Sequence, residues 1–334
     1  MADSLISVAV GGAMGAVSAA AVGYSVAKIK KEELYEKKVP LMAVTGAFVF
    51  AAQMVNITLP GTGSSGHIGG GTLLAAMLGG PAALLAISSV LIIQCLFFAD
   101  GGLLALGCNI FNMGVIPCLV VYPLIFKPLM KNKIDSKRIC AASVASAVVG
   151  LQLGAFGVTL ETLVSGITGL PFLAFVLLMQ PIHLAIGIVE GAITAAVLCF
   201  VHKMRPEILP DAGGQPSSNS YSARKLIVAL AALTLVTAGI FSVFASQYPD
   251  GLEWAVEKIT GADEPEPAVA VAGLTAIQDA TAIMPDYEYK SAGEEGSATG
   301  TSAAGLLGGA MTFVLAGGAG LLISAVKKSK KRYA

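Results

Sequence analysis

Three histidines are the residues of this chain best suited to bind a transition metal, because neutral imidazole is the commonest metal ligand in proteins. His67 lies in a glycine-rich loop, Pro60 to Gly71, that leads directly into a short apolar run. His183 lies inside a long apolar segment, and His202 follows in a basic cluster. We expect His67 to be able to approach a ligand closely, with a loop histidine bonded to a carbonyl as the ordinary alternative. We expect His202 to be solvated.

Ionisable and amide side chains inside apolar segments form a second group with chemical potential. His183 and Glu190 are seven residues apart, so they lie on one face of a predicted helix. An ionisable group at membrane depth is costly, and it marks either a transport pathway or a hydrogen bond between helices. Both interpretations stay open for Glu190. Amides in the first half predict a polar interior with hydrogen bonds between helices, and they are Gln53, Asn56, Gln94, Asn109 and Asn112.

Several chemistries are disfavoured by what the sequence does not contain. The five cysteines stand singly, without a C-x-x-C pair, and are interpreted as small packed hydrophobic residues: Cys95, Cys108, Cys118, Cys140 and Cys199. The chain has no G-x-x-x-x-G-K-[ST] loop, so any energy from ATP must come from a partner chain. It also has no H-E-x-x-H helix and no G-x-S-x-G elbow. We therefore predict that the chain is not an enzyme.

Composition places these residues in a membrane. The chain of 334 residues is 55% hydrophobic and 13% charged, with a mean hydropathy of +0.77, which predicts an all-α polytopic membrane protein. A spanning helix needs about 20 mostly apolar residues. Candidates are 5 to 27, 41 to 58, 82 to 98, 103 to 126, 139 to 164, 172 to 201, 225 to 246 and 303 to 326. The stretch 68 to 79 is shorter and glycine-rich, so it is either a short spanning helix or a re-entrant piece packed inside the protein.

The placement of charge predicts the orientation. Basic clusters lie at 28 to 38, directly after the first apolar run, and at 127 to 138, 202 to 225 and 327 to 332. The first cluster predicts that the first helix is retained, and all four predict cytoplasmic segments. The segment 247 to 300 carries eleven Asp or Glu and two Lys, so we expect it to be external. With nine crossings, the N-terminus is outside and the C-terminus is in the cytoplasm. The expected location is the cell (inner) membrane. Net charge is zero, and no nucleic-acid partner is expected.

A change in composition divides the chain into two units. Residues 206 to 222 are rich in Pro, Gly and Ser and predict a flexible cytoplasmic linker. It separates a membrane domain, 1 to 205, with about seven helices from a second unit, 223 to 334, with two helices and the acidic external loop. The Ala-rich run 267 to 284 is too short and polar to span with certainty, and we place it outside the bilayer.

Four sequence blocks resemble one transporter family. Ala51 to Asn56, Ser64 to His67 and above all Phe98 to Met113 resemble the cobalt/nickel substrate-binding membrane subunits of the CbiM/NikM type, which serve energy-coupling-factor ABC importers. Gln180 to Gly191 resembles another block of that family. Pro249 to Glu253, read PDGLE, looks like the signature of the small two-helix CbiN/NikN-type component. The chain thus resembles a fused M and N pair.

The resemblance implies a function and a site. It implies uptake of Ni²⁺ or Co²⁺ together with a transmembrane T component and two cytoplasmic ATPase subunits, and it requires no resident cofactor. It also implies that His67 binds the metal near the external face, with His183, Glu190, Asn109 and Asn112 as possible pathway residues. Family members begin Met-His, and their first residues supply the other nitrogens. Here the chain reads Met1-Ala2-Asp3. Either the Met1 amine joins His67, or an N-terminal histidine is missing from this sequence, and we expect translation to begin two codons earlier and to supply that histidine.

Two other functions remain as alternatives. The chain could be a structural or regulatory membrane subunit without metal binding, which metal retention by the purified protein would exclude. A membrane metalloenzyme is disfavoured, because three histidines and scattered cysteines give no three-ligand catalytic set. The sequence does not choose between nickel and cobalt, since both accept nitrogen donors.

Overall fold

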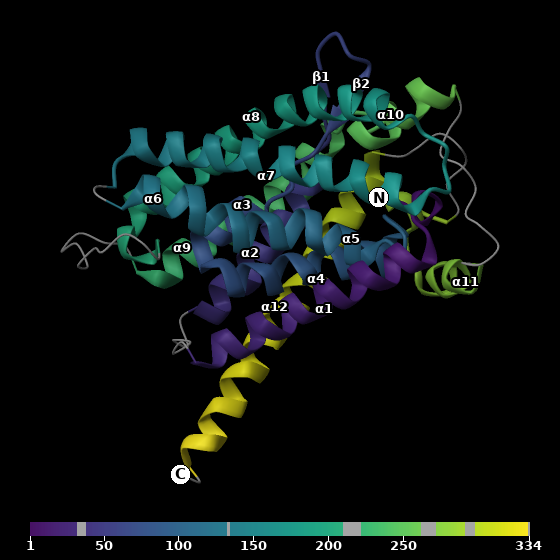
Figure 1. Cartoon of the computed structure of the whole chain (residues 1–334). Helices are drawn as coiled ribbons and strands as arrows, with labels where there is room; N and C mark the ends of the chain where they lie inside the picture. The colour runs from purple at the N-terminus through teal and green to yellow at the C-terminus, as the bar shows by residue number, and fades with distance from the viewer. Residues whose placement is uncertain (32–37, 132–133, 210–221, 262–271, 291–297, 333–334) are drawn as a thin grey trace.

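The computed structural model describes residues 1–31, 38–131, 134–209, 222–261, 272–290 and 298–332. These parts form a bundle of long helices that run between two ends of the molecule (Figure 1). Seven helices in the described parts are long and apolar enough to cross a membrane. This confirms the all-α polytopic class predicted from composition.

The seven long helices account for most of the bundle. They are α1 (Val8–Lys31), α4 (Gly80–Phe98), the continuous helix of α5 (Leu106–Ile110), η2 (Phe111–Phe126) and α6 (Lys127–Met130), then α7 (Ser136–Ser165), α8 (Phe172–Met204), α9 (Ala223–Gly239) with η4 (Phe241–Phe244), and α12 (Ala298–Arg332). The η2 segment is wound as a π-helix and contains Pro117 and Pro123. Proline has no N–H to donate within a helix, and wide turns of this kind accommodate the loss.

Two of the predicted crossings are shorter than expected. The predicted span 41 to 58 is α2 (Lys38–Gln53), because the chain turns at Met54 into a strand. The stretch 68 to 79 contains α3 (Gly71–Leu78), whose eight residues extend about 12 Å against a hydrocarbon core of about 30 Å. Every residue of α3 is buried, and Gly79, at φ 82°, separates it from α4. Thus α3 is too short to cross by itself. It continues the non-helical residues 67–70 and packs inside the protein with them, as irregular backbone at membrane depth must.

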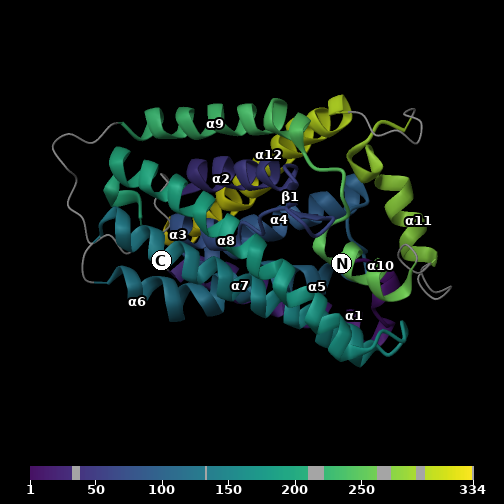
Figure 2. The same cartoon turned by 90° about the horizontal axis from the view of Figure 1, so that it is seen from above.

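Small elements gather at one end of the bundle, which we call the hairpin end. An antiparallel hairpin of β1 (Ile57–Leu59) and β2 (Ser64–Gly66) lies there with α10 (Gly251–Thr260), α11 (Ala272–Thr281) and the N-terminus (Figures 1 and 2). Single helical turns are formed by η1 (Asp3–Leu5) near the N-terminus, by η6 (Pro285–Tyr287) after α11, and by η3 (Pro206–Ile208), which follows α8. The ten-residue α11 is too short to cross a membrane.

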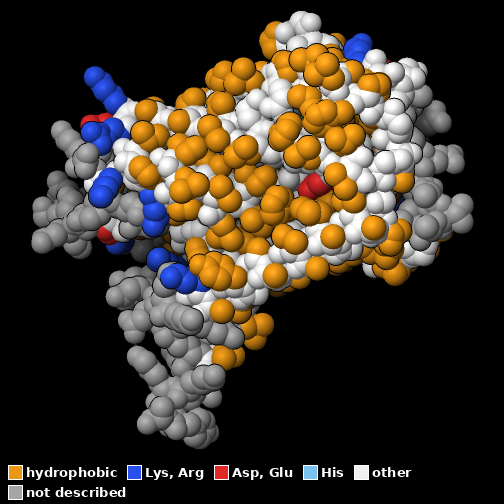
Figure 3. All heavy atoms as spheres, viewed as in Figure 1, with side chains coloured by type: hydrophobic (Ala, Val, Ile, Leu, Met, Phe, Trp, Pro, Cys, Tyr) orange, Lys and Arg blue, Asp and Glu red, His pale blue; other side chains and the backbone are white. Residues whose placement is uncertain are grey.

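The surface has an apolar belt with charges beyond it. Large apolar side chains are exposed along the long helices, with Leu177 62%, Leu235 61% and Val314 71% exposed. A soluble monomer rarely exposes so extended an apolar surface, so lipid is its natural contact. Lys and Arg side chains gather on the end where α6 and α9 lie, opposite the hairpin end (Figure 3). We call this the basic end.

Glycines let the long helices approach closely, as small residues do in lipid-embedded helix packing. A Cβ added at Gly187 would lie 2.9 Å from the Cα of Val148, and one at Gly191 would lie 2.5 Å from the Cα of Val144. These two glycines are four residues apart on α8 and bring α7 against it. On the other side of the bundle, α9 and α12 pack against α2.

The two predicted units therefore pack together in one bundle. Most of the predicted linker, residues 210–221, lies outside the described residues. The domain boundaries 1 to 205, 206 to 222 and 223 to 334 remain predictions.

The separation of the two ends predicts how the chain sits in a membrane. Single cysteines at Glu257 in α10 and Lys203 in α8, both exposed positions, would be made in a protein whose five native cysteines are replaced. We expect an impermeant maleimide added to intact cells to label position 257 and to label position 203 only after permeabilisation. Labelling of 203 but not 257 in intact cells would reverse the orientation, and labelling of both would contradict the topology.

Candidate metal-binding site

His67 lies at the start of a non-helical segment between β2 and α3. Its Nδ1 is 3.0 Å from the carbonyl oxygen of Ile68. A carbonyl can only accept a hydrogen bond, so Nδ1 carries the proton in this arrangement and Nε2 keeps its lone pair. The ring is half-buried and lines a cavity of about 170 Å³. The bond to a carbonyl, which the sequence offered as the ordinary alternative, is therefore present, and metal binding by His67 stays a prediction. Such a bond is compatible with metal binding, because metal-binding histidines commonly bond a carbonyl through their other ring nitrogen.

A polar network holds the segment after His67 in place. The buried Glu190 carboxylate of α8 accepts hydrogen bonds from the backbone N–H of Gly69 at 2.7 Å and of Gly70 at 3.2 Å. From the other side, Gln53 Nε2 donates to the Gly69 carbonyl at 2.9 Å, and Gln94 Nε2 donates to Gln53 Oε1 at 2.8 Å. The predicted hydrogen bond between helices is present here, because Gln94 of α4 donates to Gln53 of α2, and Gln53 extends it to the loop.

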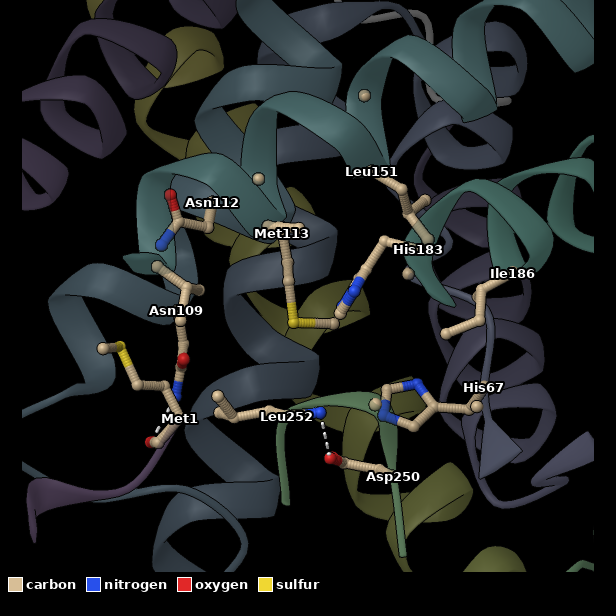
Figure 4. Close-up of a pocket in the computed structure, with 18 of the residues that line it drawn as sticks. Met1, His67, Asn109, Asn112, Met113, Leu151, His183, Ile186, Asp250 and Leu252 are labelled. Atoms are coloured by element: carbon tan, nitrogen blue, oxygen red, sulfur yellow. Dashed lines mark hydrogen bonds between the residues drawn. The ribbon is translucent and has the colours of Figure 1, made fainter. Parts of the chain in front are cut away.

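His183 enters the same cavity from α8. Its Nδ1 lies 2.8 Å from the carbonyl oxygen of Met179, which again leaves Nε2 as the ring nitrogen with a lone pair. In Figure 4 the His183 ring and the Met113 thioether point toward each other across the cavity, and His67 lies beside Asp250. His183 and Glu190 both line the cavity, as their spacing predicts. A pathway role for either residue stays a prediction.

The N-terminal segment reaches the cavity from the opposite side. The Met1 carbonyl accepts hydrogen bonds from Gly102 N–H at 3.1 Å and from Asn109 Nδ2 at 3.3 Å. Asp3 does not offer its carboxylate to the cavity, because it is buried and its Oδ1 accepts the Ala105 N–H at 2.9 Å. The N-terminal segment therefore supplies no carboxylate ligand from Asp3 to the cavity.

Asn112 belongs to a separate buried pair. Its Nδ2 donates to Glu161 Oε2 of α7 at 2.8 Å, and it also lines the cavity. Glu161 is not among the polar residues predicted from the sequence. Its signal was available, because it is an acidic residue inside the apolar run 139 to 164. A pathway role for Asn112 stays a prediction. The structure shows Asn112 bonded to the buried Glu161.

The PDGLE segment closes the cavity from the C-terminal unit. Asp250 caps α10 by accepting the N–H groups of Leu252 at 2.8 Å and Glu253 at 2.9 Å, and Glu253 accepts the Asp250 N–H in return. The signature is thus a capping box, in which an N-cap acid and a glutamate three residues later satisfy free N–H groups reciprocally. Its glycine has a separate reason: a Cβ at Gly251 would lie 2.7 Å from Ile182 and 3.2 Å from His183.

Two contacts fix α10 to the hairpin that carries His67. The Ser65 N–H donates to the Pro249 carbonyl at 2.8 Å, and the Trp254 indole N–H donates to the Thr62 carbonyl at 3.0 Å. Asp250 consequently lines the cavity together with His67. From the sequence, Asp250 was predicted only as part of the PDGLE signature. The capping box was readable from the sequence, but the surface it docks on was not.

The cavity adjoins an acidic hollow. This hollow, of about 520 Å³, shares His67, Gln94, Asp100 and Asp250 with the cavity, and Asp286 also lines it. Clustered carboxylates beside an opening raise the local concentration of cations. Burial and the Asp100 carboxylate raise the pKa of the Tyr287 hydroxyl well above its usual value, so Tyr287 stays protonated and donates to Asp100 Oδ2.

The donor set decides what the cavity could hold. Its imidazole nitrogens come from His67 and His183, and Met1, Met113 and Met179 also line it. Among the described residues, no group of three or more His, Cys, Asp or Glu side chains is placed to bind a metal ion. A metal would therefore combine one or two imidazoles with other donors, such as backbone or terminal nitrogen, thioether sulfur or water. His202 is half-buried near the end of α8 and does not line the cavity.

Comparison with known proteins gives both parts of the chain a family. Residues 1–208 match the family described as "Cobalt uptake substrate-specific transmembrane region", and residues 224–325 match the PDGLE domain. The chain is 30% identical over 286 residues to "Putative fused nickel transport protein NikMN" of Archaeoglobus fulgidus, covering 85% of this chain and 86% of that protein. It is 33% identical over 244 residues to "Cobalt transport protein CbiM" of Geobacter sulfurreducens, covering 68% and 67%.

A solved structure shares the fold of the membrane domain. The crystal structure of a truncated transition metal transporter has a TM-score of 0.54 and 30% sequence identity to this chain. The similarity covers 61% of this chain and 98% of that one.

The Glu190 contacts predict a local effect of removing one charge. In Glu190→Gln the side-chain NH₂ would face a backbone N–H donor, so one of the two loop hydrogen bonds is lost at a cost of about 1–3 kcal/mol. We expect hydrogen exchange of 67–70 to rise and the thermal midpoint to fall. Glu161→Gln is the matched control, since it changes another buried carboxylate and should leave exchange at 67–70 unaltered. Equal effects of both variants on the loop would contradict the assignment.

Proposed function

Since the chain belongs to the cobalt uptake substrate-specific transmembrane family and carries a PDGLE domain, we propose that it is the metal-binding membrane subunit of an ATP-driven importer for Ni²⁺ or Co²⁺. The observation that carries this proposal is His67, whose Nδ1 is tied to a carbonyl while Nε2 is left to the cavity. The chain itself is a transport protein, and ATP hydrolysis belongs to other subunits.

The proposed binding mode uses nitrogen donors from two sides of the cavity. His67 supplies one imidazole nitrogen, and the N-terminal segment lies within the same cavity through Met1. His183 supplies the second imidazole that the chain offers there. The acidic hollow beside His67 favours arrival of a dication from the hairpin end. Nitrogen donors suit both nickel and cobalt, and the order of affinities alone does not select one of them.

The proposed orientation puts the hairpin end outside the cell. Positive residues are retained on the cytoplasmic side, and Lys and Arg gather at the basic end (Figure 3). The metal then binds near the external face, the N-terminus is external and the C-terminus is cytoplasmic. The proposed partners are a transmembrane T component and two cytoplasmic ATPase subunits, which would engage a chain that has no phosphate-binding loop of its own.

Metal retention by the purified protein tests the site. We expect the detergent-purified full chain to bind Ni²⁺ or Co²⁺ in isothermal titration. His67→Ala should weaken binding by roughly 100-fold or more, because it removes a ligand rather than a supporting group. His202→Ala is the control, since that histidine lies away from the cavity, and it should bind as the wild type does. A wild-type chain that retains neither metal would favour the structural or regulatory subunit instead.

Uptake measurements test the dependence on partners. Cells that express this chain alone should accumulate radioactive nickel or cobalt little above background. Co-expression with the T component and the two ATPase subunits should give efficient uptake, and an ATPase variant unable to hydrolyse ATP should abolish the gain. Full uptake by this chain alone, insensitive to ATP depletion, would rule out the proposed energy coupling.

A further inference from the structure

The loop between α4 and α5, residues 99–105, is the platform on which the N-terminal segment rests. Gly102 donates its N–H to the Met1 carbonyl, and Ala105 donates its N–H to Asp3 Oδ1. Two residues of the loop hold left-handed backbone, Ala99 at φ 56° and Gly101 at φ 73°. Such a loop needs support from outside, because left-handed backbone is unfavourable for alanine.

That support comes from α11, which the sequence places in an external acidic loop. The last four carbonyls of a helix have no partner within the helix. Gln278 donates the two hydrogens of its side-chain amide to the Cys95 carbonyl at 3.0 Å, near the end of α4, and to the Gly101 carbonyl at 2.6 Å. The backbone continues the contact, because Ile283 and Met284 donate their N–H groups to the Phe97 carbonyl at 2.8 and 3.2 Å.

An aromatic contact completes this docking. The Tyr287 ring stacks on Phe98 with centroids 5.1 Å apart and an interplanar angle of 21°, while its hydroxyl donates to Asp100. Asp286 and Tyr287 have left-handed backbone at φ 50° and 62°. Consecutive left-handed residues other than glycine persist only where the surroundings hold them. The segment 272–290 is therefore docked on the end of α4 by specific contacts.

We propose that Gln278 is a positioning residue that sets the 99–105 loop and, through it, the place of Met1 at the metal cavity. Gln278 is 7% exposed and lines neither the cavity nor the acidic hollow, so it acts through the two carbonyls that it binds. The C-terminal unit thereby supports both sides of the cavity, with α10 on the His67 hairpin and α11 on the N-terminal platform. The consequence for metal affinity rests on the proposed function, whereas the consequence for the loop does not.

Hydrogen exchange on the metal-free full chain tests the positioning role. Gln278→Leu keeps a side chain of similar length but removes both hydrogen bonds, so exchange of 99–105 should speed up about tenfold. Exchange of 67–70 should stay unchanged. Asp279→Asn, at the exposed neighbouring position of α11, is the control and should alter neither segment. Tyr287→Phe, which keeps the ring but loses the hydroxyl, should speed up 99–105 to a smaller extent.

Two results would overturn the proposal at this step. One is unchanged exchange of 99–105 in Gln278→Leu. The other is an equal rise across the whole bundle, which would make Gln278 a general stabilising residue. Gln278→Met, which keeps the length of the side chain and also lacks both N–H donors, decides the matter if Gln278→Leu does not fold, because a rise confined to 99–105 supports the proposal and no rise contradicts it.

Nickel titration of the same variants tests the link to the cavity. Gln278→Leu should bind Ni²⁺ roughly tenfold more weakly and shift the absorption spectrum of bound nickel, as loss of a supporting contact does at metal sites. Asp279→Asn should bind as the wild type. Faster exchange of 99–105 with unaltered nickel affinity and spectrum would overturn the link to the site. If the wild type bound neither nickel nor cobalt, the proposed function would fail while the exchange result still decided the role of Gln278; if it bound cobalt alone, the same titration would be made with Co²⁺.

Discussion

The bond between the Glu190 carboxylate and the N–H groups of Gly69 and Gly70 is the interaction on which the site depends. The segment after His67 is non-helical backbone inside an apolar bundle, where unpaired peptide groups are expensive. A carboxylate there would also be costly without donors. Each satisfies the other, and the result is a loop held at a fixed depth with His67 at its edge. Gln53 completes the set by donating to the Gly69 carbonyl, and Gln94 in turn donates to Gln53.

Around this loop, the C-terminal unit takes part in the site rather than standing beside it. The capping box of α10 fixes the position of Asp250, and the hydrogen bonds of Ser65 and Trp254 join α10 to the hairpin. Gly251 has no side chain because His183 and Ile182 occupy the space a Cβ would need. A short sequence signature thus has two separate physical requirements, helix capping and close approach, and both serve the cavity.

Close approach also organises the rest of the membrane domain. In lipid, helices gain little from burying apolar surface, so packing of backbone against backbone has to supply cohesion. Gly187 and Gly191 bring α8 against Val148 and Val144 of α7. Glu190 lies between these two glycines in sequence, so the close helix pair also positions the carboxylate that holds the loop. Packing and polar pairing are therefore coupled on one helix.

The sequence by itself determined the membrane class, the long helices, the candidate role of His67 and the family, because hydropathy and motifs are local properties of the chain. It misjudged the end of α2 and left the 68 to 79 stretch open, since an apolar run does not show where a turn will interrupt it. Only the tertiary structure decided the partners of Glu190, the hydrogen bond of Asp3 with Ala105, the pairing of Asn112 with Glu161 and the docking of Gln278. The physical reason is that each of these hydrogen bonds joins residues far apart in the chain, 121 positions for Glu190 and Gly69, and such pairs leave no periodic pattern to read.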